Sequence, residues 1–570
     1  GGGNPLSLIF RLLKIKFHHK KLTKFRKTLE LARADLAYPP LRQCPDFNEA
    51  LWIKTWLTYR VGAILLECDK RKFMGGYLSF FSKIEQTKRD FKALQNSKIY
   101  SIKHKLKFKD EVSFELFLKN YSKLESLILS CENYEALSEL LLSNTSFVLQ
   151  NYERVQKWLN SNEFKQNYER QNHPYPSLLN PNKLNDENEP LNYNKISAEL
   201  AWELNLPLPR KYNFAYTLMH GAGGSSFYWF MRSLKVKCAN SWIGDDREYY
   251  KENYTLLRHS KGDFWIWIIH YAFFHYKKTL QLLDPNAPLL ILVRDPISVW
   301  KHLINHQSGS SRTKNVFSLD DDYALLIPDI LYTRAFYENE KYKSEKSTAP
   351  NLENLHLHSG TMVFDDVRKI IAHKEVFYID MQEIMPQNAF KTLSYLANKF
   401  HFNAPNSKEK NFYEIMHNTG GIVAILDFKI MLDEDLFVYV DSAKTRRYLD
   451  KNYININEEI LGLDPENFKL CIKKEHYDLL LKSEFYEKTK RYLKGLYAYY
   501  LKRVEIEKKK LLTEEQMLEY FKNDKALALK FKKVFDEELH HIKTHRPDIV
   551  ELWKYYKEFE KICEEFENKH

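Results

Sequence analysis

A short run of glycines and serines is the part of the sequence best suited to bind an anion. It follows an apolar segment and contains Gly221, Gly223, Gly224, Ser225 and Ser226. Glycine takes positive φ at no steric cost, so successive backbone N–H groups of such a turn can point at one place. Serine is a preferred N-cap, and the free N–H groups at a helix start attract phosphate or sulfate. The run predicts a strand, an anion-binding turn and a helix, although a tight turn that binds nothing fits the pattern equally well.

Arginine and histidine side chains follow other segments of strand length. Arg294 comes directly after an apolar run, and a guanidinium can hold phosphate oxygens through two parallel hydrogen bonds. His259 ends the segment 254–258, which we predict as a short strand. Histidine titrates near neutral pH, so His259 or His220 could take a proton from an acceptor hydroxyl as the catalytic base. His220, directly before the glycines, could instead contact a donor phosphate.

A parallel sheet is the scaffold that would bring these residues together. Continuous apolar segments at 214–219, 288–293 and 376–379 alternate with helical segments, as in a sheet covered on both faces. Ligands of such sheets bind at the carboxyl ends of the strands. We therefore predict an α/β fold in which these strands end at one edge, with Ser298 and His302 as further donor-binding candidates in the helix after Arg294. The aromatic segment 264–283 reads as a core helix.

The rest of the chain suggests four regions. We predict a helical N-terminal domain over 1–172, because apolar residues recur there every three to four positions. A proline-rich linker over 173–210 leads to the α/β domain over 211–410. The region 411–570 is expected to be mostly helical, with one strand at 436–440.

Composition narrows the setting and the partners. The 570 residues are 44% hydrophobic and carry a formal net charge of +12, which favours an acidic partner. A basic helix expected over 5–32 could lie on an anionic membrane or pack on its own domain. Six scattered cysteines fit a reducing compartment. No apolar run reaches the ~18 residues of a spanning helix, and no signal peptide is apparent. We expect a cytoplasmic protein, either free or peripheral on the inner face of the cytoplasmic membrane.

Three other groups could do chemistry. Asp320, Asp321 and Asp322 could bind a metal, but an acidic helix start or loop is the commoner meaning of such a run. His302 and His306 share a helix face, yet no third zinc ligand is near in the sequence. Asp245, Asp246 and Glu248 could supply a catalytic carboxylate, but we expect at least two of the three to be exposed to solvent. We therefore predict no resident metal.

Three of these segments, in this order, resemble the sulfotransferase fold over residues 211–403. They are the glycine–serine turn, the Arg294-Asp295-Pro296 segment and the segment from Asp380 to Pro386. In that family the first loop holds a 5′-phosphosulfate, the arginine holds another nucleotide phosphate, and a strand ends in a catalytic histidine, which implies His259 here. Ala222 stands where that family has a lysine, His302 where it has a serine, and no late Arg-Lys-Gly segment occurs. These departures argue against 3′-phosphoadenosine 5′-phosphosulfate as the donor.

A narrower resemblance is to a bacterial capsular-polysaccharide family labelled sugar transferases. It rests on the helical N-terminal domain, a Pro-Tyr-Pro linker, the segment 198–209 and the HGAGGSS turn. The resemblance implies transfer of O-methyl phosphoramidate from a cytidine-nucleotide cosubstrate to a sugar hydroxyl of capsular polysaccharide or a lipid-linked glycan, with no resident cofactor and no nucleic acid. Three alternatives remain: a sulfotransferase acting on a glycan, a metal-dependent glycosyltransferase using Asp320–Asp322, and a non-enzymatic assembly module that binds glycan or membrane.

Overall fold

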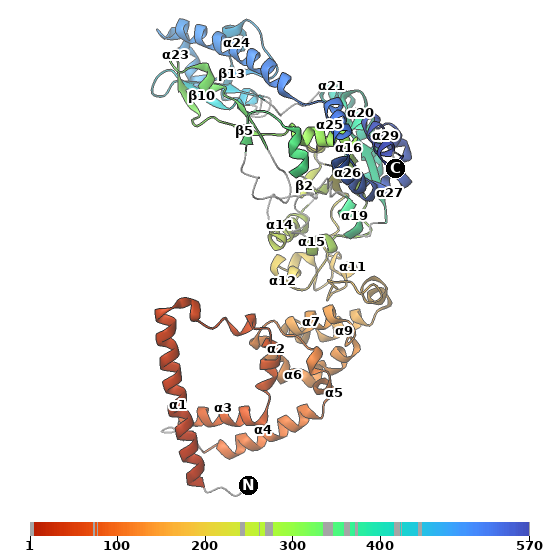
Figure 1. Ribbon diagram of the computed structural model, residues 1–570. Helices are drawn as coiled ribbons and strands as arrows, with labels where there is room; N and C mark the ends of the chain where they lie inside the picture. Colours follow the sequence, from red (N-terminus) through yellow and green to blue (C-terminus); the bar gives the residue numbers. More distant parts are fainter. Residues whose placement is uncertain are drawn as a thin grey trace. The chain divides into compact units, whose positions relative to one another are not determined.

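The computed structural model falls into two compact units, which are described separately (Figure 1). One contains Gly1–Lys183 with Glu203–Leu206, and the other contains Leu184–Trp202 with Pro207–His570. The structure describes residues 5–71, 75–76, 78–219, 221–239, 245–260, 263–267, 277–333, 346–357, 365–370, 374–414, 422, 425–442 and 447–568. The segment 173–210, expected as a linker, is divided between the two units.

The first unit is built from helices around an aromatic core. Trp52 packs edge-on against Phe114 with ring centroids 5.3 Å apart, and Phe108 packs on Phe114 at 4.9 Å. The longer helices of this unit are α1 (Pro5–Ala32), α2 (Phe47–Ile53), α3 (Leu57–Lys70), α4 (Phe80–Gln95), α6 (Glu111–Ser130), α7 (Glu135–Ser143), α8 (Thr145–Gln150) and α9 (Tyr152–Leu159). Shorter ones are α5 (Lys98–Ser101) and α10 (Asn162–Phe164), and α11 (Pro181–Leu184) and α12 (Ala198–Glu203) lie where the two units divide the chain.

A parallel sheet forms the centre of the second unit. Its strands are β1 (Phe214–Leu218), β2 (Lys237–Ala239), β3 (Phe264–Trp267), β4 (Leu289–Val293) and β9 (Val376–Asp380). They lie in the order β2-β3-β1-β4-β9, and all neighbours are parallel. Every residue of β1 and β4 is buried, as expected for inner strands covered on both faces. The α/β prediction with three strands ending at one edge is therefore confirmed.

Two elements around this sheet differ from the sequence expectation. The segment 254–258 is the end of helix α14 (Asp246–Arg258) and not a strand, because Tyr250, Tyr254 and Leu257 recur at helical spacing and bury one face. The aromatic segment expected as a helix from 264 begins as strand β3 and reaches helix α15 at Lys277–Gln281, while 268–276 lies outside the described residues. Further helices are α13 (Gly224–Ser233), α16 (Pro296–Ile304), α19 (Asp365–Ile370), α20 (Pro386–Phe400) and α21 (Lys410–Tyr413).

A second sheet interrupts the region expected to be mostly helical. It is ordered β12-β13-β11-β10-β6, with β6 at Val316–Ser318, β10 at Phe428–Met431, β11 at Phe437–Asp441, β12 at Tyr453–Asn455 and β13 at Lys469–Lys473. Only β11 was expected. Strands β6 and β12 have three residues each, and β10 and β13 carry lysines that obscure their alternation. Helix α24 (Tyr486–Lys510) buries Leu493 and Leu496 against this sheet. Beside it lie β5 (Gln307–Ser310), β7 (Ile330–Thr333), β8 (Lys346–Ser347), α17 (Tyr323–Leu326), α22 (Asn457–Leu461) and α23 (Tyr477–Lys482).

Helices return at the end of the chain. They are α25 (Glu514–Asn523), α26 (Lys525–Glu538), α27 (His540–His545), α28 (Pro547–Glu551) and α29 (Lys554–Asn568). Aromatic side chains join them, with Phe521 and Phe559 5.0 Å apart and Trp300 of α16 5.1 Å from Phe531. Among the described residues, no helix is long and apolar enough to cross a membrane.

Candidate functional site

The carboxyl edge of the first sheet is where the topology favours a ligand. Strands β1 and β4 are neighbours, but the chain leaves β1 towards β2 at one edge of the sheet and leaves β4 towards β9 at the other. Ligands of open α/β sheets bind where the connections diverge in this way. The glycine turn follows β1 and Arg294 follows β4, so both lie at this point.

The glycine turn has the backbone that its sequence predicts. Gly221 and Gly223 have φ values of +80° and +99°, which other residues rarely adopt. A Cβ at Gly221 would lie 2.6 Å from Cδ2 of His302, and one at Gly224 would lie 2.6 Å from Cδ1 of Leu218. A side chain at either position would therefore displace its neighbours.

Helix α13 begins at Gly224, so both serines of the glycine–serine run lie inside the helix. Gly223 is the N-cap and makes no side-chain cap, so Ser225 and Ser226 lie in the first turn and not at the cap. Among the described residues, no acceptor is found for the N–H groups of Gly224, Ser225 and Ser226. These are the free donors that give a helix start its partial positive charge.

Arg294 is held against this turn. Its Nη1 donates to the carbonyl of Gly221 at 2.8 Å, while its backbone N–H contacts the sulfur of Met219 at 3.4 Å. The side chain is half-buried and forms no ion pair with a described residue. Burial lowers the pKa of Arg294, and the charges of Glu514, Asp295 and Asp380 oppose that shift. The guanidinium thus remains a cation with donors to spare.

The two buried carboxylates at this edge hold helices in place. Oδ1 of Asp295 accepts the N–H of Ile297 in α16 at 2.9 Å, and Oδ2 accepts those of Tyr555 and Tyr556 in α29 at 2.9 and 3.1 Å. Asp380 accepts the indole N–H of Trp553 at 2.8 Å and caps the turn that follows β9. Burial raises the pKa of both carboxyl groups.

Ser298 is at the site, but its hydroxyl already has a partner. It donates to Oε1 of Glu514 at 2.8 Å, and Nζ of Lys301 lies 3.1 Å from the same oxygen. Burial raises the pKa of Glu514, but the hydrogen bond from Ser298 and the charge of Lys301 outweigh it, so this pKa lies below its usual range. Glu514 could not be recognised from the sequence, because it lies 216 residues beyond Ser298 along the chain.

The predicted histidines do not come together. His302 packs on the glycine turn, whereas His306 lies beyond the end of α16, just before β5, with the two ring centroids 6.3 Å apart. The expectation that these two histidines share a helix face is therefore wrong. His259 is exposed, accepts a hydrogen bond from Nε of Arg258 at 2.8 Å and follows a helix. The carbonyl of Arg258 accepts from Lys211, which precedes β1, so His259 lies at the amino edge of the sheet. About 16 Å of strand separates the two edges. His220 lies outside the described residues.

The other acidic candidates have structural partners. Asp320 pairs with Lys488 at 2.7 Å, Asp321 pairs with Lys314 at 2.8 Å, and Asp322 caps α17. Asp245 caps α14, and Asp246 accepts the N–H groups of Lys278 and Thr279 at the start of α15. Across the part of the chain that the structure describes, no group of three His, Cys, Asp or Glu side chains could hold a metal ion.

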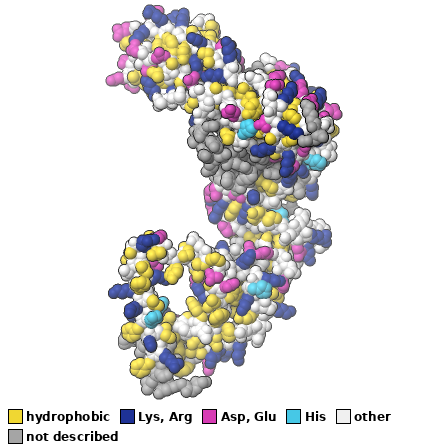
Figure 2. Space-filling model, in the orientation of Figure 1, with side chains coloured by type: hydrophobic (Ala, Val, Ile, Leu, Met, Phe, Trp, Pro, Cys, Tyr) yellow, Lys and Arg dark blue, Asp and Glu magenta, His cyan; other side chains and the backbone are white. Residues whose placement is uncertain are grey.

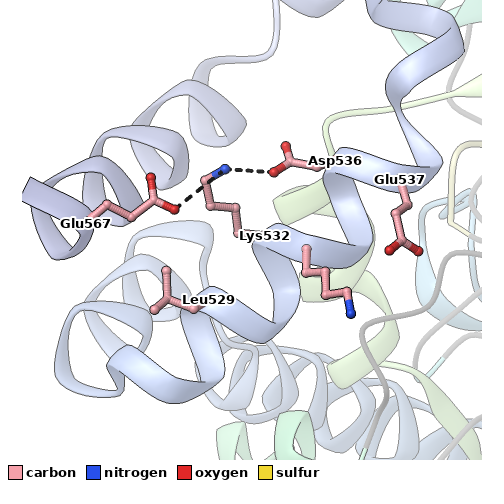
Figure 3. Close-up of a pocket in the computed structure, with 6 residues that line it drawn as sticks. Leu529, Lys532, Asp536, Glu537 and Glu567 are labelled. Atoms are coloured by element: carbon pink, nitrogen blue, oxygen red, sulfur yellow. Dashed lines mark hydrogen bonds and ion pairs between the residues drawn. The ribbon is translucent and has the colours of Figure 1, made fainter.

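A surface pocket on α26 and α29 is separate from these residues (Figure 3). It has a volume of about 510 Å³ and is lined by Leu529, Lys532, Lys533, Asp536, Glu537 and Glu567. Lys532 already pairs with Asp536 at 2.7 Å and with Glu567 at 4.0 Å. No strand of the first sheet contributes to the lining, so the pocket offers no link to the glycine turn.

Comparisons with known proteins describe two regions of the chain. A family model described as "Protein of unknown function (DUF2972)" matches residues 378–566, from β9 to α29. Another, described as "Domain of unknown function (DUF8374)", matches residues 4–93. No curated protein and no solved structure matches the chain. The first match includes Glu514, Trp553 and Tyr555, which contact the carboxyl edge of the sheet.

Proposed function

We propose that the carboxyl edge of the first sheet binds the phosphates of a nucleotide-activated donor. On this proposal the protein transfers a phosphorus-containing group, most specifically O-methyl phosphoramidate from a cytidine nucleotide, to a sugar hydroxyl of capsular polysaccharide. The nature of the group and of the acceptor rests on the family resemblance of the sequence. The sulfotransferase-like character of the fold belongs to the same proposal.

The contact between Arg294 and Gly221 is the observation that carries this proposal. It joins a half-buried guanidinium without an ion pair among the described residues to the turn that starts α13. A buried cation and free backbone N–H groups at one place suit an anion whose charge is spread over several oxygens. Preorganised donors of this kind also stabilise the charge that develops on a leaving phosphate.

The geometry favours His302 over His259 as the base. The ring of His302 packs on Gly221, whereas His259 is at the opposite edge of the sheet. In the transfer that we propose, the acceptor hydroxyl oxygen forms a bond to phosphorus while the bond from phosphorus to the nucleotide oxygen breaks. The hydroxyl proton goes to His302, and the nucleotide leaves with the electron pair, held by Arg294. No covalent intermediate with the protein is required.

Ligand-induced stabilisation tests the donor site. Cytidine diphosphate, adenosine 3′,5′-bisphosphate and inorganic phosphate would each be added to the purified chain, since a ligand at about 100 times its Kd stabilises by ~2.7 kcal/mol. We expect the cytidine nucleotide to raise the melting temperature most. Arg294→Ala should weaken its binding by about tenfold or more, the equivalent of losing a charged hydrogen bond of ~1.5–3 kcal/mol.

Two further variants separate binding from folding. Arg294→Lys keeps the charge and loses the paired donors, so its affinity should fall between those of wild type and Arg294→Ala. Arg232→Ala, at the exposed far end of α13, should bind as wild type does. Equal nucleotide affinity in wild type and Arg294→Ala would overturn the site. A stronger shift with the adenosine bisphosphate would replace the phosphoramidate donor with a sulfuryl donor.

A further inference from the structure

Helix α1 exposes large apolar side chains along its length. Phe10, Phe17, Phe25 and Ile15 are 73%, 71%, 63% and 65% exposed. In the second half of the helix, Ile15, Leu22, Phe25 and Leu29 follow one another at spacings of seven, three and four residues, so they share one face. Phe10 and Phe17 lie on a different side of the helix, at roughly 100° from this face. Lys16, which pairs with Asp69 of α3 at 2.7 Å, lies roughly 100° around the helix from Ile15. The contact with α3 leaves the apolar face open, because its four side chains are between 38% and 65% exposed.

The same helix carries an unusual share of the charge. Its 28 residues include eight basic side chains and one acidic one, a net charge of +7, against +12 for the whole chain. Lys16 pairs with Asp69 and Arg26 pairs with Glu30 at 3.1 Å. The structure shows no ion pair with a described residue for the other six, which are Arg11, Lys14, Lys20, Lys21, Lys24 and Lys27. Figure 2 shows basic and hydrophobic side chains interleaved on the surface of α1.

The exposed apolar face and the basic charge of α1 together favour one kind of binding partner. Two copies of so basic a helix would repel one another, which disfavours self-association along this face. Nucleic acid would neutralise the lysines but would leave the aliphatic and phenyl groups against a polar backbone. An anionic lipid surface satisfies both, because apolar side chains enter the acyl boundary while lysine stems extend their charges to the headgroups.

We propose that α1 docks the first unit on an anionic phospholipid bilayer, lying in the plane of its surface. The proposal does not depend on the anion site of the second unit. Each basic residue near such a surface strengthens binding about fivefold, the equivalent of ~1 kcal/mol, and salt weakens this attraction.

Vesicle sedimentation of the full chain tests the proposal. We expect binding to vesicles of phosphatidylcholine mixed with phosphatidylserine, weaker binding at high salt and little binding to phosphatidylcholine alone. The triple variant Lys20→Glu, Lys24→Glu, Lys27→Glu keeps good helix formers and should bind at least about 100-fold more weakly. Its matched control carries Lys408→Glu, Lys522→Glu and Lys561→Glu, three exposed lysines of the second unit, and should bind as wild type does.

A second pair of variants tests whether the apolar side chains of α1 contribute to bilayer binding. Leu22→Gln combined with Phe25→Gln should release most of the protein from anionic vesicles, whereas Leu449→Gln with Leu552→Gln, two exposed leucines of the second unit, should not. Circular dichroism would confirm that helix content is unchanged. Failure to bind anionic vesicles, equal binding to neutral vesicles, or retention of binding by the Leu22/Phe25 variant would each overturn the proposal. Dimerisation that these two substitutions abolish would assign the face to a second copy instead.

Discussion

At the scale of single residues, the candidate site depends on the absence of a side chain at Gly221 as much as on the guanidinium of Arg294. Gly221 lacks a side chain, and the ring of His302 occupies the space that a Cβ would take. Arg294 uses one N–H on the carbonyl of this glycine and retains the rest of its donors. The glycines could be predicted from sequence because their backbone requirement is local. The roles of Ser298 and Glu514 could not, because each is defined by the other across 216 residues.

The carboxylate of Glu514 leads to a prediction about acid stability. Glu514→Gln should cost about 1 kcal/mol at neutral pH, because it removes the charge that Ser298 and Lys301 stabilise. The pKa of Glu514 is lowered in the folded protein, so the unfolded chain takes up the proton first as the pH falls. The advantage of wild type should therefore be complete above about pH 4.3 and disappear as the pH falls through the folded pKa.

Urea denaturation at a series of pH values would measure this difference, provided that the fold survives at the acidic end. The exposed Glu537→Gln serves as the control for loss of a surface carboxylate, and its free energy of unfolding at neutral pH should be close to that of wild type. A gap between wild type and Glu514→Gln that widens on acidification would contradict the assignment.

At the scale of elements, continuous apolar runs were predictable and mixed runs were not. Strands β1, β4 and β9 are nearly uniform in character and could be placed from sequence, together with the edge at which they end. The end of α14 reads locally as a strand, and its helical face is visible only when Tyr250 and Leu257 are considered together. Apart from β11, the strands of the second sheet are too short or too mixed in composition for their alternation to be distinguished from a helical pattern.

Asp295 connects two helices that the sequence gives no reason to pair. Its side chain accepts N–H groups from α16 and from the first turn of α29, so Asp295→Ala should remove the N-cap of α16 and the acceptor for two N–H groups of α29. Single caps are worth ~1 kcal/mol, so the expected loss is about 2 kcal/mol. Chemical denaturation would measure it beside Asp322→Ala, which removes the cap of the short helix α17 alone. Equal losses in the two variants would show that the contact with α29 contributes nothing.

At the scale of the whole molecule, the chain consists of two units with separate cores. The aromatic cluster of Trp52, Phe108 and Phe114 belongs wholly to the first unit. A helical first region could be predicted from periodicity. The point of division could not, because residues 203–206 return to the first unit after the chain has entered the second.

Separate cores predict separate responses to mutation. Phe114→Ala removes a fully buried ring and should destabilise the first unit by ~3–5 kcal/mol. Hydrogen exchange followed by mass spectrometry should show faster exchange over residues up to 183 and unchanged protection in β1 and β4. Loss of protection in the central strands of the second unit would mean that the two units unfold as one.

The contact between Asp295 and α29 can form only late in the synthesis of the chain. The amides that it binds in α29 are 260 residues further along the chain. Synthesis at about 5–20 residues per second means that the carboxylate waits on the order of tens of seconds for its partners. During that time the nascent polypeptide contains most strands of the first sheet but lacks α29. The carboxylate of Asp295, which is buried in the complete protein, is then still in contact with water. A ribosome stalled before α29 would therefore carry a chain whose parallel sheet has formed while Asp295, at its carboxyl edge, still lacks the N–H groups of α29.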